Sequence, residues 1–247
     1  MLKSKKKIIS CKLFYNFDFI VLINFIKKLI PEIDLLKPRE CPFKLIRIGG
    51  NKDGAYLIPD DLLGIEACFS PGVSNSKDFE DHLASKYKIK SHMCDYSSDI
   101  AKFKTKIIKG FQTFEKKWLD IKNNENCINL EDWVEKYSPN SQDDLILQMD
   151  IEGAEYRNIL NTKIKLIKRF RIIIIELHNV LNLFDESNAK NIKSLLKKLN
   201  ETHICIHAHP NNCQNRVIVD VNNGMNIPNV IELSYLRKDR FKKKSKL

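Results

Sequence analysis

Apolar and polar residues alternate along most of the chain in a pattern that predicts short strands separated by helices. Strands are expected where β-branched and aromatic residues run between turn residues, and helices where apolar residues recur at helical spacing. The predicted strands are Glu66–Val73, Ile89–Asp95, Thr105–Lys109 and His203–His207, and the predicted helices are Leu130–Tyr137, Ser187–Leu199 and a stretch that follows Ser76 and ends at Tyr87. Ser76 or Asn75 is expected to cap this last helix.

Two further strands are strongly apolar. One is Asp144–Asp150, and the other, Arg171–Glu176, contains four consecutive isoleucines. Such a β-branched run is typical of a strand that is covered on both faces of a parallel sheet. The alternation therefore predicts a doubly wound sheet. Arg216–Val221 and Asn229–Leu236 are expected to pair antiparallel at its edge.

The first sixty residues predict a helix followed by a hairpin. Phe19–Ile26 is apolar but much shorter than the roughly 20 residues that cross a bilayer, so we expect an amphipathic helix and no transmembrane segment. No small-residue cleavage site follows the basic start, which argues against a signal peptide. Two strands within Lys44–Gly50 and Ala55–Pro59 flank Asp53-Gly54, which is a strong hairpin signal.

Composition indicates one globular domain with charged ends. The 247 residues are 43% hydrophobic and 9% aromatic, which suits a single α/β domain with a full core. Of the net charge of +11, residues 1–44 and 237–247 carry +6 each, and residues 45–236 carry −1. We divide the chain into a basic N-terminal helical extension (1–44), a catalytic domain (45–240) and a basic tail (241–247). The basic ends can attract an anionic surface weakly, or serve only as solubilising segments.

The cysteines indicate a reducing compartment. Seven are scattered along the chain, and no CxxC pair occurs among them. This pattern argues against a disulfide framework and against a zinc–thiolate site, and it predicts a cytoplasmic protein.

Polar residues follow the predicted strands at their carboxyl ends, where ligands bind in open parallel sheets. Gly72 and Ser74 follow the first strand, and a glycine there lets a ligand approach the backbone, although a purely structural turn explains it as well. Asp95 ends the next strand, where a carboxylate can accept hydrogen bonds from ribose hydroxyls or simply cap a helix. The chain has no GxGxxG sequence, which disfavours a dinucleotide site.

Acidic residues and histidines follow the two apolar strands. Asp150, Glu152 and Glu155 lie so close together that they repel one another unless a cation, donors or solvent compensate them, and Glu155 also suits the start of the next helix. Glu176 and His178 are two apart, so their side chains point the same way.

His207 and His209 repeat this spacing on a later strand. Carboxylates with imidazole suit Mn²⁺, Fe²⁺ or Zn²⁺ better than Ca²⁺. A hydrogen bond between Glu176 and a histidine would need no metal, and this alternative stays open.

Three passages make the chain resemble the FkbM-type methyltransferases, a family of S-adenosylmethionine-dependent O-methyltransferases. They are Arg47–Gly50 with Asp53–Tyr56, Phe69–Ser74 with Phe79, Glu80 and Asp95, and Met149–Glu155. The resemblance runs from about residue 44 to 236, and Ala55 and Pro71 depart from the family's usual pattern. It implies a Rossmann-like methyltransferase fold of the α/β class, with a mostly parallel seven-stranded sheet. Asn229–Leu236 would supply its antiparallel edge strand.

The resemblance and the acid–histidine pattern together imply a site. S-adenosylmethionine is the expected cofactor, bound by Ser70, Gly72, Ser74, Glu80 and Asp95. The expected catalytic residues are Asp150, His178 and His207, and the expected ligands of a divalent metal, Mn²⁺ or Mg²⁺, are Asp150, Glu176, His178 and His209. The sulfonium methyl is already activated, so the protein has to align an acceptor oxygen and lower its pKa, which a metal can do. The expected acceptor is a sugar hydroxyl on a small molecule or glycan.

Three alternatives stay open. A nucleic-acid methyltransferase fits the basic ends, but the body of the chain lacks basic residues interleaved with aromatic ones. A metal-dependent hydrolase without S-adenosylmethionine fits the acid–histidine cluster but leaves Gly72 and Asp95 unexplained. A non-catalytic sugar-binding protein would keep the same residues.

Overall fold

The computed structural model describes residues 34–50, 54–180, 182, 185–211, 216–219 and 225–241. The helix expected at Phe19–Ile26, most of the N-terminal extension, and the tail beyond residue 241 lie outside this range. Within the described part of the chain, no helix has the length and apolar character that crossing a membrane requires.

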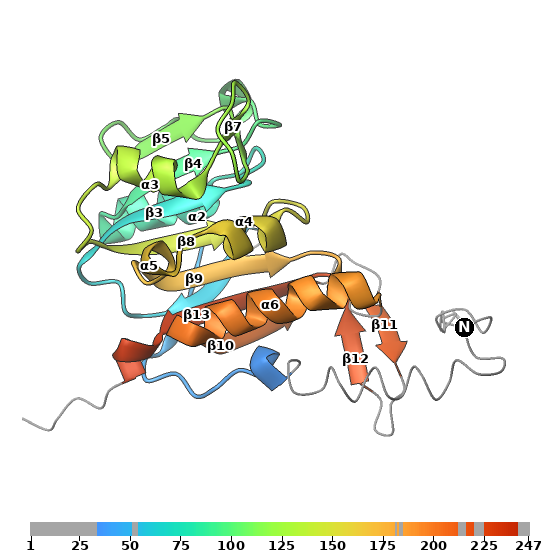
Figure 1. The fold of residues 1–247 in the computed structure, drawn as a ribbon. Helices are drawn as coiled ribbons and strands as arrows, with labels where there is room; N and C mark the ends of the chain where they lie inside the picture. Colours follow the sequence, from blue (N-terminus) through green and yellow to red (C-terminus); the bar gives the residue numbers. More distant parts are fainter. Residues whose placement is uncertain are drawn as a thin grey trace, which may run out of the picture.

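A seven-stranded mixed sheet forms the centre of the molecule (Figure 1). In spatial order its strands are β10 (His203–Pro210), β13 (Ile231–Arg237), β9 (Phe170–Leu177), β8 (Asp144–Met149), β3 (Ile65–Pro71), β4 (Lys90–Cys94) and β5 (Gln112–Glu115). The five strands from β9 to β5 run parallel, and β13 runs antiparallel to both of its neighbours. The expected α/β fold with a seven-stranded sheet is confirmed at this level.

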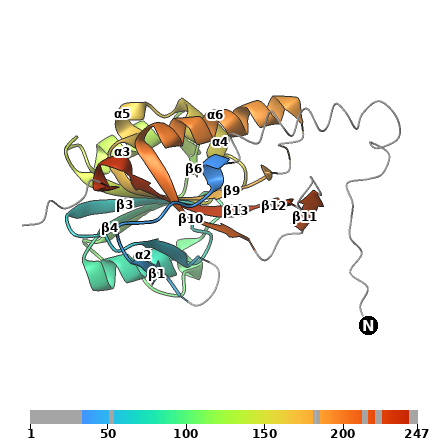
Figure 2. The ribbon, with the colours of Figure 1, turned by 90° about the horizontal axis from the view of Figure 1, so that it is seen from below.

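Both faces of the sheet are covered (Figure 2). One face carries α3 (Leu130–Tyr137), α4 (Glu155–Asn161), α5 (Ile164–Ile167) and α6 (Glu186–Thr202). The other carries α2 (Asp78–His82) and the hairpin of β1 (Leu45–Ile48) and β2 (Tyr56–Pro59). Each face has its own apolar core, one containing Trp133 and the other Phe79. The isoleucines of β9 are divided between these two cores, which is why the strand reads as continuously apolar.

The remaining elements are short. They are η2 (Asp34–Leu36), the π-helical turn η3 (Leu83–Tyr87), η4 (Ile100–Lys102), β6 (Trp118–Leu119), β7 (Cys127–Ile128), β11 (Arg216–Val219), β12 (Met225–Pro228) and η6 (Lys238–Phe241). β11 and β12 pair with each other as a separate two-stranded ribbon.

Local patterns placed most elements correctly, and the helix Leu130–Tyr137 is confirmed at both ends. The strand predicted at Thr105–Lys109 is wrong, because β4 pairs instead with Gln112–Glu115, and Thr105 and Lys106 are exposed. The predicted cap of the helix after residue 76 is also wrong. Lys77 precedes α2 without a side-chain cap, and the Asn75 side chain accepts a hydrogen bond from the Asp99 backbone instead.

The antiparallel strand lies inside the sheet and not at its edge. β13 is inserted between β9 and β10, so β10 forms the edge, and Arg216–Val219 pairs with β12. Leu233, Tyr235 and Leu236 of β13 are at most 2% exposed, and they belong to the cores on both faces. A strand that is apolar on both sides is more stable with neighbours on both edges.

Candidate functional site

The carboxyl ends of β3, β4, β8 and β9, together with the loops that follow them, carry most of the residues predicted to be functional. Three of these loops contain a non-glycine residue with positive φ, namely Ser74 (50°), Glu152 (54°) and Asn179 (57°). Only one other such residue, Lys88, occurs in the described ranges. The left-handed conformation is unfavourable for Ser and Glu, although Asn tolerates it better, and it concentrates at functional sites.

Gly72 joins the ends of β3, β4 and β8. Its φ is 85°, and a Cβ atom at this position would lie 1.6 Å from the carbonyl oxygen of Asp150. The backbone also connects these strand ends, since Gly72 N donates to Cys94 O (2.9 Å) and Asp150 N donates to Pro71 O (3.3 Å). The glycine is therefore required for the approach of the chain's own backbone, whatever ligand the turn also binds.

Asp95 lies against the turn that contains Gly72 and Ser74. One carboxylate oxygen accepts from Ser74 N (2.8 Å), and the other accepts from the backbone and hydroxyl of Ser97 (2.8 and 2.7 Å). A carboxylate offers about four acceptor positions, so these three bonds leave one for a ligand hydroxyl.

A cavity of about 170 Å³ opens at the same turn. Gly72 and Ser74 line it together with Glu80, Gln148 and Asp150. Among the described residues, two carboxylates and no basic side chain line this cavity. A cationic group suits such surroundings, and the sulfonium and ammonium groups of S-adenosylmethionine are cations.

Glu80, on α2, lines the cavity, and Ser70, on β3, lies next to Glu80. Glu80 is 2% exposed and Ser70 is fully buried. Burial raises the pKa of Glu80 to about 7, although a hydrogen bond with Ser70 acts in the opposite direction. Ser70 Oγ also lies 3.3 Å from Cys68 Sγ. Glu80 therefore faces the cavity directly, and Ser70 orients the Glu80 carboxylate through their hydrogen bond.

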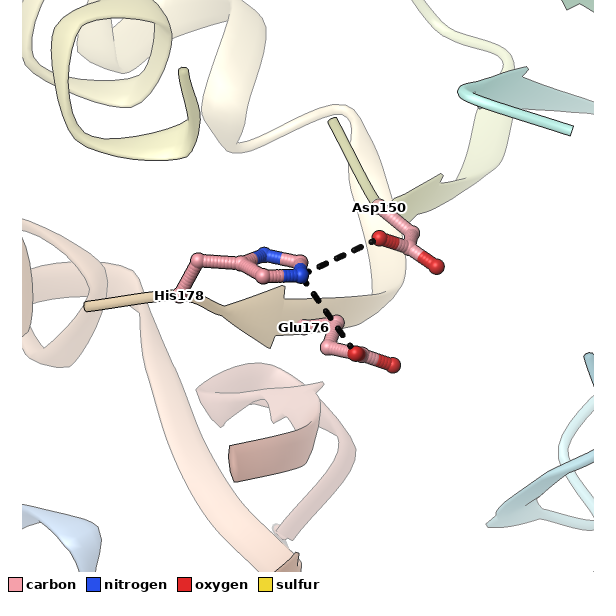
Figure 3. Close-up of side chains that lie close together, drawn as sticks. All are labelled: Asp150, Glu176 and His178. Atoms are coloured by element: carbon pink, nitrogen blue, oxygen red, sulfur yellow. Dashed lines mark ion pairs between the residues drawn. The ribbon is translucent and has the colours of Figure 1, made fainter. Parts of the chain in front are cut away.

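Asp150, Glu176 and His178 converge at the ends of β8 and β9 (Figure 3). Nε2 of His178 lies 3.8 Å from Oδ1 of Asp150 and 3.6 Å from Oε1 of Glu176. Glu152, on the same loop as Asp150, brings a third carboxylate oxygen to 3.4 Å from the same nitrogen.

The other imidazole nitrogen is held by Glu155. Nδ1 of His178 lies 3.1 Å from Oε1 of Glu155, which also accepts from the backbone N–H groups of Ile151 (3.0 Å) and Gly153 (3.1 Å). Glu155 has no exposed surface. A carboxylate that holds Nδ1 leaves Nε2 free to bind a metal, as in carboxylate–histidine–metal arrangements.

The surroundings of the cluster raise the pKa values of both Asp150 and His178. Burial and the charge of Glu176 raise the pKa of Asp150 to about 8. Burial alone would lower the pKa of His178, but the hydrogen bond and charge of Glu155 and the charge of Asp150 raise it to about 9. The cluster therefore favours the presence of a positive charge, whether proton or metal ion.

The cluster fits a divalent metal. Ligand atoms held about 2.1 Å from one ion at a tetrahedral angle lie about 3.4 Å apart, close to the distances around Nε2. One ligand atom from each of Asp150, Glu176 and His178 lies within 4.8 Å of the other two. Oδ1 of Asp150 is buried and has no hydrogen-bond partner among the described residues. Such an atom is costly unless a cation or donor compensates it.

The structure does not bring His207 and His209 into this cluster. Both are half-buried on β10, where their rings stack with centroids 6.3 Å apart. In the sheet register, His209 is opposite Glu232, which is in turn opposite Glu176. Two strand spacings, about 10 Å of backbone, therefore separate His209 from Glu176.

The sequence alone did not predict the contacts that four residues make around the site, namely Tyr56, Gln148, Glu155 and Asn211. Nε2 of Gln148 donates to the Tyr56 hydroxyl (3.1 Å), and Nδ2 of Asn211 donates to Oε1 of Glu176 (3.0 Å). Gln148 stands two residues before Asp150, so strand alternation places both on one side and was a usable signal. Nothing local points to Tyr56, Asn211 or the contact of Glu155 with His178, because their partners are distant in sequence.

Comparison with known protein families gives a match. The profile of the methyltransferase FkbM domain matches residues 72–217, which include Gly72, Asp95 and the whole acid–histidine cluster. Among curated proteins, none matches this chain.

Proposed function

Because the chain belongs to the FkbM methyltransferase domain family, we propose that this methyltransferase uses S-adenosylmethionine to methylate a sugar hydroxyl with the assistance of a divalent metal. The observation that carries the proposal is the position of Asp150. Its carboxylate lines the 170 Å³ cavity together with that of Glu80, and it also belongs to the cluster with Glu176 and His178. A methyl donor and a metal-bound acceptor would therefore meet at one side chain.

The residues around Gly72 divide the binding of the cofactor between them. The cavity is smaller than the roughly 300–1,000 Å³ of pockets that enclose a whole ligand, so it suits the cationic end of the molecule. Asp95, which is bonded to the turn, has an acceptor position for a ribose hydroxyl. Ser74 links the cavity to Asp95, since it lines the cavity and donates its N–H to Asp95.

Asp150, Glu176 and His178 would hold the metal, and a bound metal would lower the pKa of the acceptor hydroxyl. Glu155 keeps the imidazole oriented, and Asn211 holds the Glu176 carboxylate. With one carboxylate oxygen on the metal, Asp150 would have its other oxygen available to take the proton that the acceptor loses. His207 and His209 have no part in this proposal because β13 separates them from β9.

The test combines cofactor binding with metal dependence. Purified protein should bind S-adenosylhomocysteine in calorimetry both before and after chelation. Transfer of labelled methyl groups to a panel of methyl glycosides should stop on chelation and return with Mn²⁺.

A matched pair of variants localises the metal. Glu176→Gln should reduce transfer on the order of 100-fold and weaken Mn²⁺ binding, because it removes a charged ligand with little change in volume. Glu66→Gln, which changes an exposed acid at the start of β3, should affect neither. Full methyl transfer by the chelated protein would refute the proposed role of a metal. A lack of binding to S-adenosylhomocysteine would refute S-adenosylmethionine as the methyl donor.

A further inference from the structure

A second and larger cavity, about 360 Å³, lies beside the acid–histidine cluster. It opens between α4 and α6, which lie side by side in Figures 1 and 2, and the loop that follows β9. Its volume falls within the range of about 300–1,000 Å³ that is usual for small-molecule sites.

Asparagine side chains give this cavity its polar surface. Asn179, Asn182, Asn188 and Asn191 line it, two from the loop and two from α6. Nδ2 of Asn188 donates to Asp185 (3.1 Å), and no hydrogen bond within the described ranges joins the other three amides to a protein group. Each amide offers two donors and one acceptor, which matches a hydroxyl group that both donates and accepts.

Apolar groups line the rest of the cavity. Tyr156 contributes its ring, whose position is fixed because its hydroxyl donates to the His178 carbonyl (2.6 Å). Leu160 and Ile192 also contribute apolar surface. A pyranose has the corresponding two kinds of surface, hydroxyls at its rim and C–H groups on its faces.

The charge of the cavity is balanced. Arg157 is the only basic residue in the described part of the chain that lines it, and this guanidinium is paired with both carboxylate oxygens of Asp120 at 2.8 and 3.3 Å. No acid lines the cavity among the described residues. A site for a phosphate or carboxylate would be expected to contain a cationic side chain that is not already paired with an acid. The surface of this cavity therefore fits a neutral ligand better.

The cavity and the cluster share two loops. Gly153, which lines the cavity, follows Asp150 by three residues, and Asn179 directly follows His178. We propose that this cavity is the subsite that holds a neutral pyranose ring of the acceptor, with the amides of Asn179 and Asn191 bonding to its hydroxyls. The link to methyl transfer rests on the proposed function, whereas binding of the sugar does not.

Saturation-transfer NMR on chelated, cofactor-free protein tests the subsite directly. The probes are the methyl glycosides of glucose, mannose, rhamnose and fucose, with inorganic phosphate as an anionic comparison. At least one glycoside should bind, and Asn179→Ala and Asn191→Ala should each weaken that binding by about 2- to 10-fold, the effect of one lost hydrogen bond. Asn200→Ala, at an exposed asparagine on the far side of α6, is the matched control and should bind as the unchanged protein does.

The outcomes separate the subsite from the proposed function. Absence of binding by all four glycosides, equal binding by the variants, or binding of phosphate in their place would overturn the subsite. Methyl transfer to a glycoside with an unchanged KM in both variants would also overturn it while leaving the methyltransferase proposal intact. Pocket-dependent binding of a glycoside supports the subsite even where no methyl transfer to that sugar is found.

Discussion

Nδ1 of His178 lies 3.1 Å from Oε1 of Glu155, a residue that has no exposed surface. The two residues come from the end of β9 and the start of α4, and their contact fixes which imidazole nitrogen faces Asp150 and Glu176. Glu155 therefore acts on the proposed metal through His178 and does not touch it.

This positioning role predicts the effect of Glu155→Gln. The amide keeps the shape but weakens the hold on Nδ1, so Mn²⁺ affinity should fall by about 10- to 100-fold. Calorimetric titration with Mn²⁺ measures the change, and S-adenosylhomocysteine affinity should stay constant. Glu131→Gln, on α3, serves as the control, because Glu131 also accepts a backbone hydrogen bond, from Lys163 N (2.8 Å), but does not belong to the cluster. Equal Mn²⁺ affinity in all three proteins would remove Glu155 from the metal site.

Gly72→Ala should destabilise the fold. The new methyl group would meet the Asp150 carbonyl, and positive φ adds strain, so we expect a loss of about 3 kcal/mol or more in the free energy of unfolding. Gly110→Ala provides a matched control, because Gly110 has the same φ of 85° and no atom within 4 Å of its Cβ position. Its cost should be only about 1–2 kcal/mol. Urea denaturation measures both, and similar losses would show that the approach to Asp150 is unimportant.

Asp95→Ala should weaken S-adenosylhomocysteine binding by about 10- to 100-fold. The substitution removes both the acceptor for the ribose and the partner of Ser74 N. Asp99→Ala is the comparison, because Asp99 lies in the same loop but its side chain only caps η4. Calorimetry on folded proteins gives the affinities. Unchanged affinity in Asp95→Ala would refute the assignment of this residue to the cofactor.

Acid should destabilise the protein through His203. This side chain is fully buried, with Nε2 at 2.6 Å from Phe170 O and Nδ1 at 2.7 Å from Thr202 Oγ1. Burial lowers its pKa from 6.5 to about 4, so the unfolded chain takes up a proton at a higher pH than the folded one. Stability from this residue is full above pH 6.5 and is lost as the pH falls toward 4, on the order of 3 kcal/mol in total.

The measurement is the free energy of unfolding in urea from pH 7 to pH 5. His203→Gln should be less stable at pH 7, because it disturbs a buried site, but its stability should fall less steeply with pH. Parallel pH profiles for the two proteins would contradict the assignment. His92 acts in the same direction, because burial also lowers its pKa to about 4.

The sequence by itself determined the local elements and the core of the site. The apolar run of Arg171–Glu176 identified a buried parallel strand, and strand alternation placed Glu176 and His178 on one side. The acids that follow the strand at Asp144–Asp150 marked the neighbouring strand end. These are consequences of residue order within a few positions, since burial of apolar side chains imposes a periodicity that can be read without knowing the neighbours.

Only the tertiary structure decided what lies next to what. The position of β13 between β9 and β10 is set by pairing between segments that are distant in the chain. This position separates His209 from Asp150, Glu176 and His178, the residues with which the sequence had predicted it would bind a metal. The same holds for Glu155, whose acceptance of two backbone N–H groups and whose contact with His178 depend on a folded loop. Gly72 shows the difference most simply. Its turn was expected from local sequence, but the reason for a glycine is the Asp150 carbonyl, which reaches that point only when β3 and β8 lie side by side.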